Sequence, residues 1–224
     1  MRYPGGKGKC FQHLINLMPP HRTYIESHLG GGAVLRNKSP ASYSIGIDKD
    51  PLVISVWQKS YPGFCDLVQS DAAEFLRNYK YEGNELIYAD PPYLRSVRRR
   101  SRVYACDYTL NDHERLLGVV KELPCMVMLS GYDNELYNDT LVGWRKEEFF
   151  AKTHVDVRQE CVWLNYEPPR LLHDASFLGS NFRERQTIRR RQQRLRERIT
   201  KMDTLERSEF IRWLANTYGL VEGV

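Results

Sequence analysis

The stretch Leu86-Ile87-Tyr88-Ala89-Asp90-Pro91-Pro92-Tyr93 leaves the chain little choice of local structure. Its first four residues are apolar or aromatic strand formers, which predicts a short buried strand. The two prolines that follow cannot extend a sheet, so the chain has to turn there. The turn leaves the Asp90 carboxylate, the Pro91 carbonyl and the Tyr93 ring at the carboxyl end of the strand.

Ligands of open α/β sheets bind outside the carboxyl ends of the strands. Two hydrogen-bond acceptors beside a flat ring suit a planar ligand that carries an amino group, such as adenine. The same residues would also serve as a strand-terminating turn with an acid on the surface. This stretch alone leaves both interpretations open.

Short apolar strands alternate with helices along most of the chain, which predicts a mainly parallel sheet covered on both faces. The expected strands are residues 23–27, 43–47, 65–69, 86–89, 125–130, 144–150 and 160–166. The expected helices are residues 11–18, 53–59, 72–79 and 111–122, with a further helix opening at the glycine turn 30–32. The last two strands are too close in sequence for a crossover helix, so we expect them to pair antiparallel.

The character of the chain changes after Pro169, and we expect a sheet domain over residues 1–169 and a helical appendage over residues 170–224. The appendage shows an apolar stripe at helical spacing, surrounded by arginines. That stripe consists of Ile188, Leu195, Ile199 and Met202. A second helix is expected over residues 208–218.

The net charge of +5 is unevenly distributed. A first basic segment has no acid among its arginines, which are Arg95, Arg98, Arg99, Arg100 and Arg102. A second, residues 183–201, has nine basic and two acidic side chains. The two segments carry +5 and +7, which leaves −7 for the remainder. This pattern predicts a polyanionic partner at the basic segments.

Several classes of protein are disfavoured. The five cysteines are scattered and form no Cys-x-x-Cys pair, which argues against a disulfide framework and a structural zinc site. No apolar run approaches the roughly 20 residues that span a bilayer, and the first residues do not resemble a signal peptide. We therefore expect a cytoplasmic protein without a membrane partner.

A strand, the turn Gly30-x-Gly32, a helix, a second strand and Asp48 follow one another in an order that is typical of sites for adenosine-containing cofactors. A glycine turn lets a ligand approach the backbone, and an acid after the next strand can accept both ribose hydroxyls. The turn could instead serve only tight strand–helix packing. Asp71 follows the third strand and would add a second acid, although it is also a natural helix cap.

Five motifs, in their order along the chain, resemble those of the Dam-type (class alpha) DNA adenine methyltransferases. They are Tyr3-Pro4-Gly5-Gly6-Lys7, Glu26-Ser27-His28-Leu29-Gly30-Gly31-Gly32, Asp48, Asp71 and Asp90-Pro91-Pro92-Tyr93. Segments 130–133 and 160–166 are also similar, so that the resemblance spans residues 2–166. It implies a Rossmann-like S-adenosylmethionine-dependent methyltransferase fold, with a mostly parallel seven-stranded sheet and one antiparallel strand.

The resemblance also implies residue roles, an S-adenosylmethionine cofactor and no metal. The cofactor-binding residues would be Tyr3, Lys7, Glu26, His28, Gly30, Gly32, Asp48, Asp71 and Asp90. Among these, Asp48 would hold the ribose and Asp71 the cofactor's adenine. The catalytic residues would be Asp90, Pro91, Pro92 and Tyr93. Asp90 and the Pro91 carbonyl would bind the target amine, while Tyr93 would stack on the target base.

The expected reaction is methyl transfer to the exocyclic amine of an adenine flipped out of duplex DNA, with the arginines at 95–102 gripping phosphates. The sequence departs from the family in two places. Ser27-His28 replaces the usual Pro-Phe, and the insertion that reads the target sequence is missing between Asp48 and Asp71. Recognition would then fall to the loop 94–108 or to the appendage. An RNA base N-methyltransferase and a catalytically inactive nucleic-acid-binding partner remain alternatives, and the oligomeric state is open.

Overall fold

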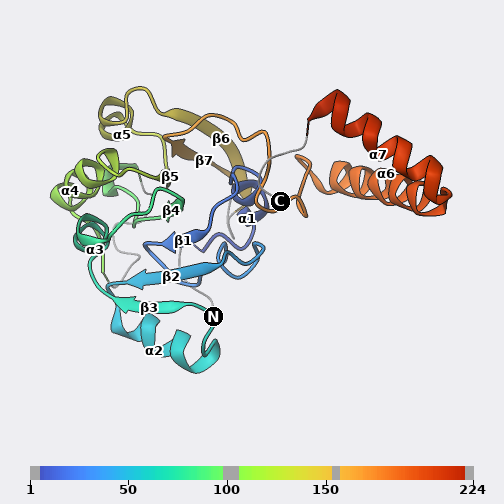
Figure 1. Ribbon diagram of the computed structural model, residues 1–224. Helices are drawn as coiled ribbons and strands as arrows, with labels where there is room; N and C mark the ends of the chain where they lie inside the picture. Colours follow the sequence, from blue (N-terminus) through green and yellow to red (C-terminus); the bar gives the residue numbers. More distant parts are fainter. Residues whose placement is uncertain (1–5, 98–105, 153–156, 220–224) are drawn as a thin grey trace. The chain divides into compact units, whose positions relative to one another are not determined.

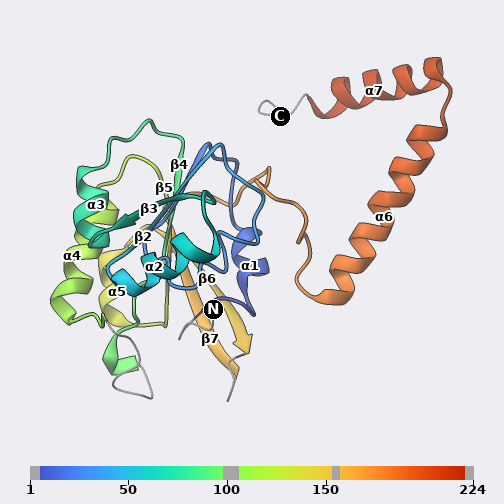
Figure 2. The same ribbon diagram turned by 90° about the horizontal axis from the view of Figure 1, so that it is seen from below.

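The structure is a computed structural model, which describes residues 6–97, 106–152 and 157–219. It divides the chain into two compact units, residues 1–174 and residues 175–224. The first unit contains a β-sheet with its covering helices, and the second contains two helices (Figures 1 and 2).

Seven strands form the sheet, in the order β3-β2-β1-β4-β5-β7-β6 (Figure 1). Strands β1 to β5 pair in parallel, and β7 is antiparallel to both of its neighbours. The bounds are Thr23–Glu26 (β1), Tyr43–Asp48 (β2), Asp66–Gln69 (β3), Glu85–Ala89 (β4), Met126–Gly131 (β5), Arg145–Lys152 (β6) and Val157–Leu164 (β7). The predicted fold class, Rossmann-like with one antiparallel strand, is confirmed.

The helices of the first unit lie close to their predicted positions. They are α1 (Phe11–Ile15), α2 (Pro51–Ser60), α3 (Ala72–Asn78), α4 (Leu110–Lys121) and α5 (Glu135–Thr140), with a short 3-10 turn, η1 (Arg95–Val97). The sequence pattern did not predict α5 or η1. A side-chain cap begins α5, because Asn134 accepts a hydrogen bond from the Tyr137 backbone N–H at 2.9 Å.

The helix expected after the glycine turn does not form, and that prediction was wrong. Residues 33–37 form successive turns instead. The Leu35 backbone N–H donates to the Glu26 carboxylate at 3.0 Å, and Gly32 has a positive φ of 55°. A helix needs a regular series of backbone hydrogen bonds and helical φ angles. Here a side chain accepts one of the backbone N–H bonds, and a glycine has a left-handed conformation.

Both faces of the sheet are covered. On one face, Ile25, Ile87 and Val127 pack with Leu116 and Leu117 of α4 in the main core. On the other face Tyr24, Leu86 and Met128 are also buried, and α1 lies on that side (Figure 2). Alternate residues of each strand therefore serve opposite layers, as a doubly covered parallel sheet requires.

The second unit consists of α6 (Phe182–Lys201) and α7 (Thr204–Tyr218). Asn181 caps α6 and Asp203 caps α7 through backbone N–H groups of their first turns. Within residues 175–219, no side chain is buried. The sequence analysis placed the boundary after Pro169, and the first compact unit of the structure ends at Asp174, which accepts from the Ser39 N–H at 2.8 Å.

None of the helices in the described residues combines the length and the apolarity needed to cross a membrane.

We predict that Gly32→Ala is markedly more destabilising than Gly63→Ala. Both glycines have positive φ, 55° and 72°, so both variants carry a backbone cost of about 1–2 kcal/mol. A Cβ at Gly32 would lie 2.1 Å from the Trp57 ring, while nothing lies within 4 Å of one at Gly63. Overpacking should add about 1–3 kcal/mol to the Gly32 variant alone. Urea unfolding measures the difference, and equal destabilisation of the two variants would contradict the packing argument.

Candidate functional site

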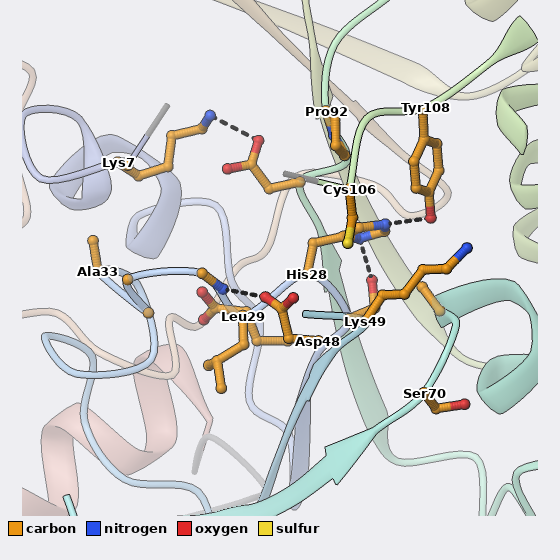
Figure 3. Close-up of a pocket in the computed structure, with 18 residues that line it drawn as sticks. Lys7, His28, Leu29, Ala33, Asp48, Lys49, Ser70, Pro92, Cys106 and Tyr108 are labelled. Carbon is orange, nitrogen blue, oxygen red and sulfur yellow. Dashed lines mark hydrogen bonds and ion pairs between the residues drawn. The ribbon is translucent and has the colours of Figure 1, made fainter. Parts of the chain in front are cut away.

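The pocket of the first unit lies where the strand order of the sheet reverses. The chain passes from β1 to β2 on one side and returns to β4 on the other, so the carboxyl ends of these strands border a crevice. Their loops line the pocket, together with the segment before α1 and the residues before α4 (Figure 3). The lining residues are Gly6, Lys7, Glu26–Ala33, Asp48, Lys49, Ser70, Ala72, Asp90, Pro92, Cys106 and Tyr108.

The glycine turn is anchored from two directions. The Gly30 N–H donates to Asp48 Oδ2 at 2.8 Å, and the Gly30 carbonyl accepts from Trp57 Nε1 at 2.9 Å (Figure 3 shows the first of these bonds). Gly32 also has to lack a side chain, because Trp57 packs directly on it. The turn therefore lines the pocket and also serves close packing against α2.

Asp48, at the end of β2, combines rigidity with spare acceptor capacity. Its Oδ1 accepts from the Asp50 N–H at 2.9 Å, and its Oδ2 accepts from Gly30. Each carboxylate oxygen has two lone pairs, so the Asp48 carboxylate keeps acceptor capacity for a ligand. Burial raises the pKa of Asp48, and the backbone N–H bonds oppose that shift. An acid held in this way suits the hydroxyl groups of a ribose.

Glu26, at the end of β1, is buried in the wall of the pocket. Its Oε2 accepts from the Tyr24 hydroxyl and the Leu35 N–H, each at 3.0 Å. Burial raises the pKa of Glu26 to about 8 against these bonds. At neutral pH the carboxyl group is therefore mainly protonated.

Asp90 follows β4 and forms a buried ion pair with Lys7, with Nζ 2.7 Å from Oδ1. Lys7 Nζ also donates to the Tyr93 hydroxyl at 2.6 Å, and that hydroxyl donates to Glu160 Oε2 at 2.5 Å. Burial raises the pKa of Asp90 and Lys7 opposes the shift. The two carboxylates outweigh burial at Lys7, whose pKa is raised.

Tyr93, expected to stack on a base, does not line the pocket. Its hydroxyl is held by Lys7 and Glu160, and its ring packs edge-on against Tyr132 at a centroid distance of 4.5 Å. Pro91 is buried and likewise lies outside the lining, whereas Pro92 is part of it. The network around Tyr93 instead connects Asp90 to the antiparallel strand β7.

Asp71 lies beside the pocket rather than in its lining. It caps α3 by accepting from the Glu74 N–H at 3.2 Å, and it forms an ion pair with Arg115 of α4 at 2.8 Å. Lys49 approaches the same carboxylate at 3.7 Å. Asp71 therefore acts as a helix cap, which is the second role that the sequence analysis left open for it.

His28 lines the pocket as a neutral ring. Its Nε2 lies 2.8 Å from the Tyr108 hydroxyl, and its Nδ1 lies 3.0 Å from the Ser27 hydroxyl (Figure 3). Burial lowers the pKa of His28 to about 3. The sequence analysis did not predict that Tyr108 and Cys106 line the pocket. The only sequence signal for these two residues is their position just before the cap of α4.

The remaining predicted site residues are the arginines of the first basic segment and Tyr3. Arg95, in η1, forms an ion pair with Asp107, with Nε 3.3 Å from Oδ2. The others lie outside the described residues, namely Tyr3, Arg98, Arg99, Arg100 and Arg102. Within the described ranges, no group of three or more His, Cys, Asp or Glu side chains is arranged to hold a metal ion.

No protein-family model and no curated protein matches the sequence. Solved structures with a similar fold include the 23S rRNA methyltransferase ErmE, with 11% identity and a TM-score of 0.47 over 84% of each chain. Precorrin 8w decarboxylase of Methanobacterium thermoautotrophicum has 12% identity and a TM-score of 0.46, over 72% of this chain and 92% of its own. An rRNA methylase of Streptococcus thermophilus has 13% identity and a TM-score of 0.45, over 73% and 97%.

We predict that Glu26→Gln flattens the dependence of stability on pH. The folded pKa of about 8 lies above the ordinary 4.5, so folding binds a proton between these values. The contribution is complete below pH 4.5 and is lost as pH rises through 8, because a raised pKa favours the protonated folded state. Gln cannot titrate, so the wild type should lose on the order of a few kcal/mol more than the variant between pH 5 and pH 9.

Urea unfolding at each pH gives the two curves. The exposed Glu135→Gln, on α5, provides a matched control that should track the wild type. Parallel wild-type and Glu26→Gln curves would show that Glu26 does not carry this proton.

Proposed function

We propose that the first unit is an S-adenosylmethionine-dependent methyltransferase that acts on the exocyclic amine of adenine in DNA. The proposal is carried by one observation. Asp90, after β4, lines the same pocket as Glu26, the glycine turn 30–32 and Asp48, after β1 and β2. An acceptor for an amino group and a nucleoside-binding wall are therefore combined at the switch point of the sheet.

The pocket residues fit the cofactor that the sequence resemblance implies. Asp48 keeps free lone pairs while two backbone N–H groups fix its direction, which suits a ribose. The glycine turn has no side chain between the backbone and a ligand at positions 30–32. Bound there, S-adenosylmethionine would supply an activated methyl group on a positively charged sulfur.

Asp90 acts on the target amine. The lone pair of an adenine amine is delocalised into the ring, so the amine is a poor nucleophile. Asp90 lines the pocket and accepts one of its N–H bonds, which directs the lone pair toward the methyl group. Positive charge develops on the nitrogen, and the ionised carboxylate of Asp90 stabilises it in a site of low dielectric constant.

Lys7 and Tyr93 position this carboxylate. Lys7 fixes one oxygen of Asp90 through an ion pair of 2.7 Å and opposes the effect of burial on its pKa. Tyr93 shares the ammonium group of Lys7 and is anchored by Glu160. The rings that line the pocket are those of His28 and Tyr108, which are the aromatic surfaces available to a base that has left its stack.

We predict that Asp90→Asn lowers methyl transfer to adenine in DNA by about 100-fold or more, because the charge that stabilises the cationic nitrogen is removed. DNA binding should change little, since Asp90 lies inside the pocket with a side chain only 17% exposed, where phosphate groups do not contact it. Transfer of a labelled methyl group and binding of labelled duplex are measured on the same preparations. Asp139→Asn, on the exposed side of α5, has the same change of charge and should keep wild-type activity.

Three results would overturn the proposal or part of it. Full turnover in Asp90→Asn would exclude Asp90 as the acceptor. Transfer to transcribed RNA but not to duplex DNA would change the substrate. Wild-type protein that binds no S-adenosylmethionine by calorimetry and transfers no methyl group would be a nucleic-acid-binding partner rather than an enzyme.

A further inference from the structure

Helix α6 carries a concentrated positive charge that the pocket does not use. Its 20 residues include nine basic and two acidic side chains, a net charge of +7. No side chain of the helix is buried. In the described part of the chain, no ion pair joins an α6 arginine to an acid. This charge is therefore available to a partner.

Most of the basic side chains fall into two rows along the helix, because residues three, four and seven apart share a face. The first basic row contains Arg183, Arg190, Arg194, Arg198 and Lys201. The second basic row contains Arg185, Arg189 and Arg196. Like charges at i, i+4 destabilise an isolated helix, so helix stability does not account for the rows.

Two different surfaces separate the rows. On one side lies an apolar stripe of Ile188, Leu195 and Ile199. On the other side lies a polar row at seven-residue spacing, which contains Gln186, Gln193 and Thr200. Gln193 is exposed, and its amide N–H donates to Glu197 at 2.9 Å, which leaves its carbonyl oxygen and its second N–H available. The polar row is thus bordered by cations on both sides.

We propose that α6 docks in the major groove of duplex DNA, with the two basic rows on the phosphates of the two strands and Gln193 toward the base edges. A helix of 20 residues is about 30 Å long and fits a groove about 12 Å wide. Glutamine can pair with an adenine edge through two hydrogen bonds.

Duplex DNA is favoured over RNA because the major groove of A-form RNA is too narrow for side chains to read. The rows are rigid and parallel, which matches a regular double backbone better than a flexible single strand. The inference rests on the proposed function only for the choice of nucleic acid as the polyanion. It assigns the docking to a segment outside the part of the chain that carries the family motifs.

The test measures binding of full-length protein to a labelled duplex over a range of KCl concentrations. In the variant Arg190→Gln/Arg194→Gln/Arg198→Gln, the slope of log K against log salt should decrease by about 0.9 for each phosphate that the variant no longer neutralises. The matched control Lys59→Gln/Lys80→Gln/Lys121→Gln removes the same charge from exposed positions of the first unit and should keep the wild-type slope. Circular dichroism checks that α6 remains helical, as Gln is a good helix former.

A slope unchanged in the α6 variant, or lowered equally in the control, would overturn the proposal. Equal wild-type binding to duplex RNA of the same sequence, with the same sensitivity to the α6 substitutions, would also overturn groove docking. Gln193→Ala should keep the salt slope but reduce by about tenfold the preference for sequences selected from a random duplex pool. An unchanged preference would remove Gln193 from recognition.

Methyl transfer at saturating DNA and low salt separates this proposal from the function of the pocket. If the α6 variant has a reduced salt slope but no preparation transfers a methyl group, then α6 docking stands and the enzymatic proposal fails. If transfer proceeds with a normal slope in the α6 variant, the enzymatic proposal stands and α6 docking fails.

Discussion

The buried ion pair between Lys7 and Asp90 is the interaction on which the pocket depends. Removing one partner of such a pair leaves an uncompensated buried charge and costs about 3–5 kcal/mol. The backbone carbonyl of Lys7 also accepts N–H bonds from Cys10 and Phe11 at the start of α1, at 3.0 and 2.8 Å. One residue therefore fixes the segment before α1, the turn after β4 and, through Tyr93 and Glu160, the antiparallel strand β7.

The opposite wall of the pocket is fixed by a separate set of contacts. Asp48 holds the backbone of Gly30, and Trp57 of α2 fills the space that Gly32 leaves. This wall consists of backbone and a carboxylate directed by N–H groups, so it has little conformational entropy to lose when a ligand binds. Under the proposed function, this wall would hold the nucleoside and Asp90 would be the acceptor across from it, which are the two features that positioning of a methyl group requires.

The sequence predicted those parts of the site that local chemistry determines. Prolines after β4 fix the turn that presents Asp90, and the strand pattern fixes its place at the edge of the sheet. The sequence pattern could not predict contacts between segments that are far apart along the chain. Tyr93 contacts Glu160 across 67 positions, and Arg115 contacts Asp71 across 44 positions, so that Asp71 is both a helix cap and part of an ion pair. The missing helix after Gly32 depends likewise on Glu26, whose side chain competes for backbone N–H groups.

Under the two proposals, binding and chemistry belong to different parts of the chain, and the distribution of charge agrees with that division. Nine of the 33 basic residues and two of the 28 acidic residues lie in α6, so the chain outside α6 has a net charge of −2. A polyanion is then attracted by local basic segments rather than by the net charge of the whole chain. At physiological salt this attraction acts over a Debye length of about 8 Å. Salt screens the exposed arginines of α6 strongly but screens the buried Lys7–Asp90 pair far less. Under the two proposals, rising ionic strength should therefore weaken DNA binding by α6 well before it disturbs Asp90 in the pocket.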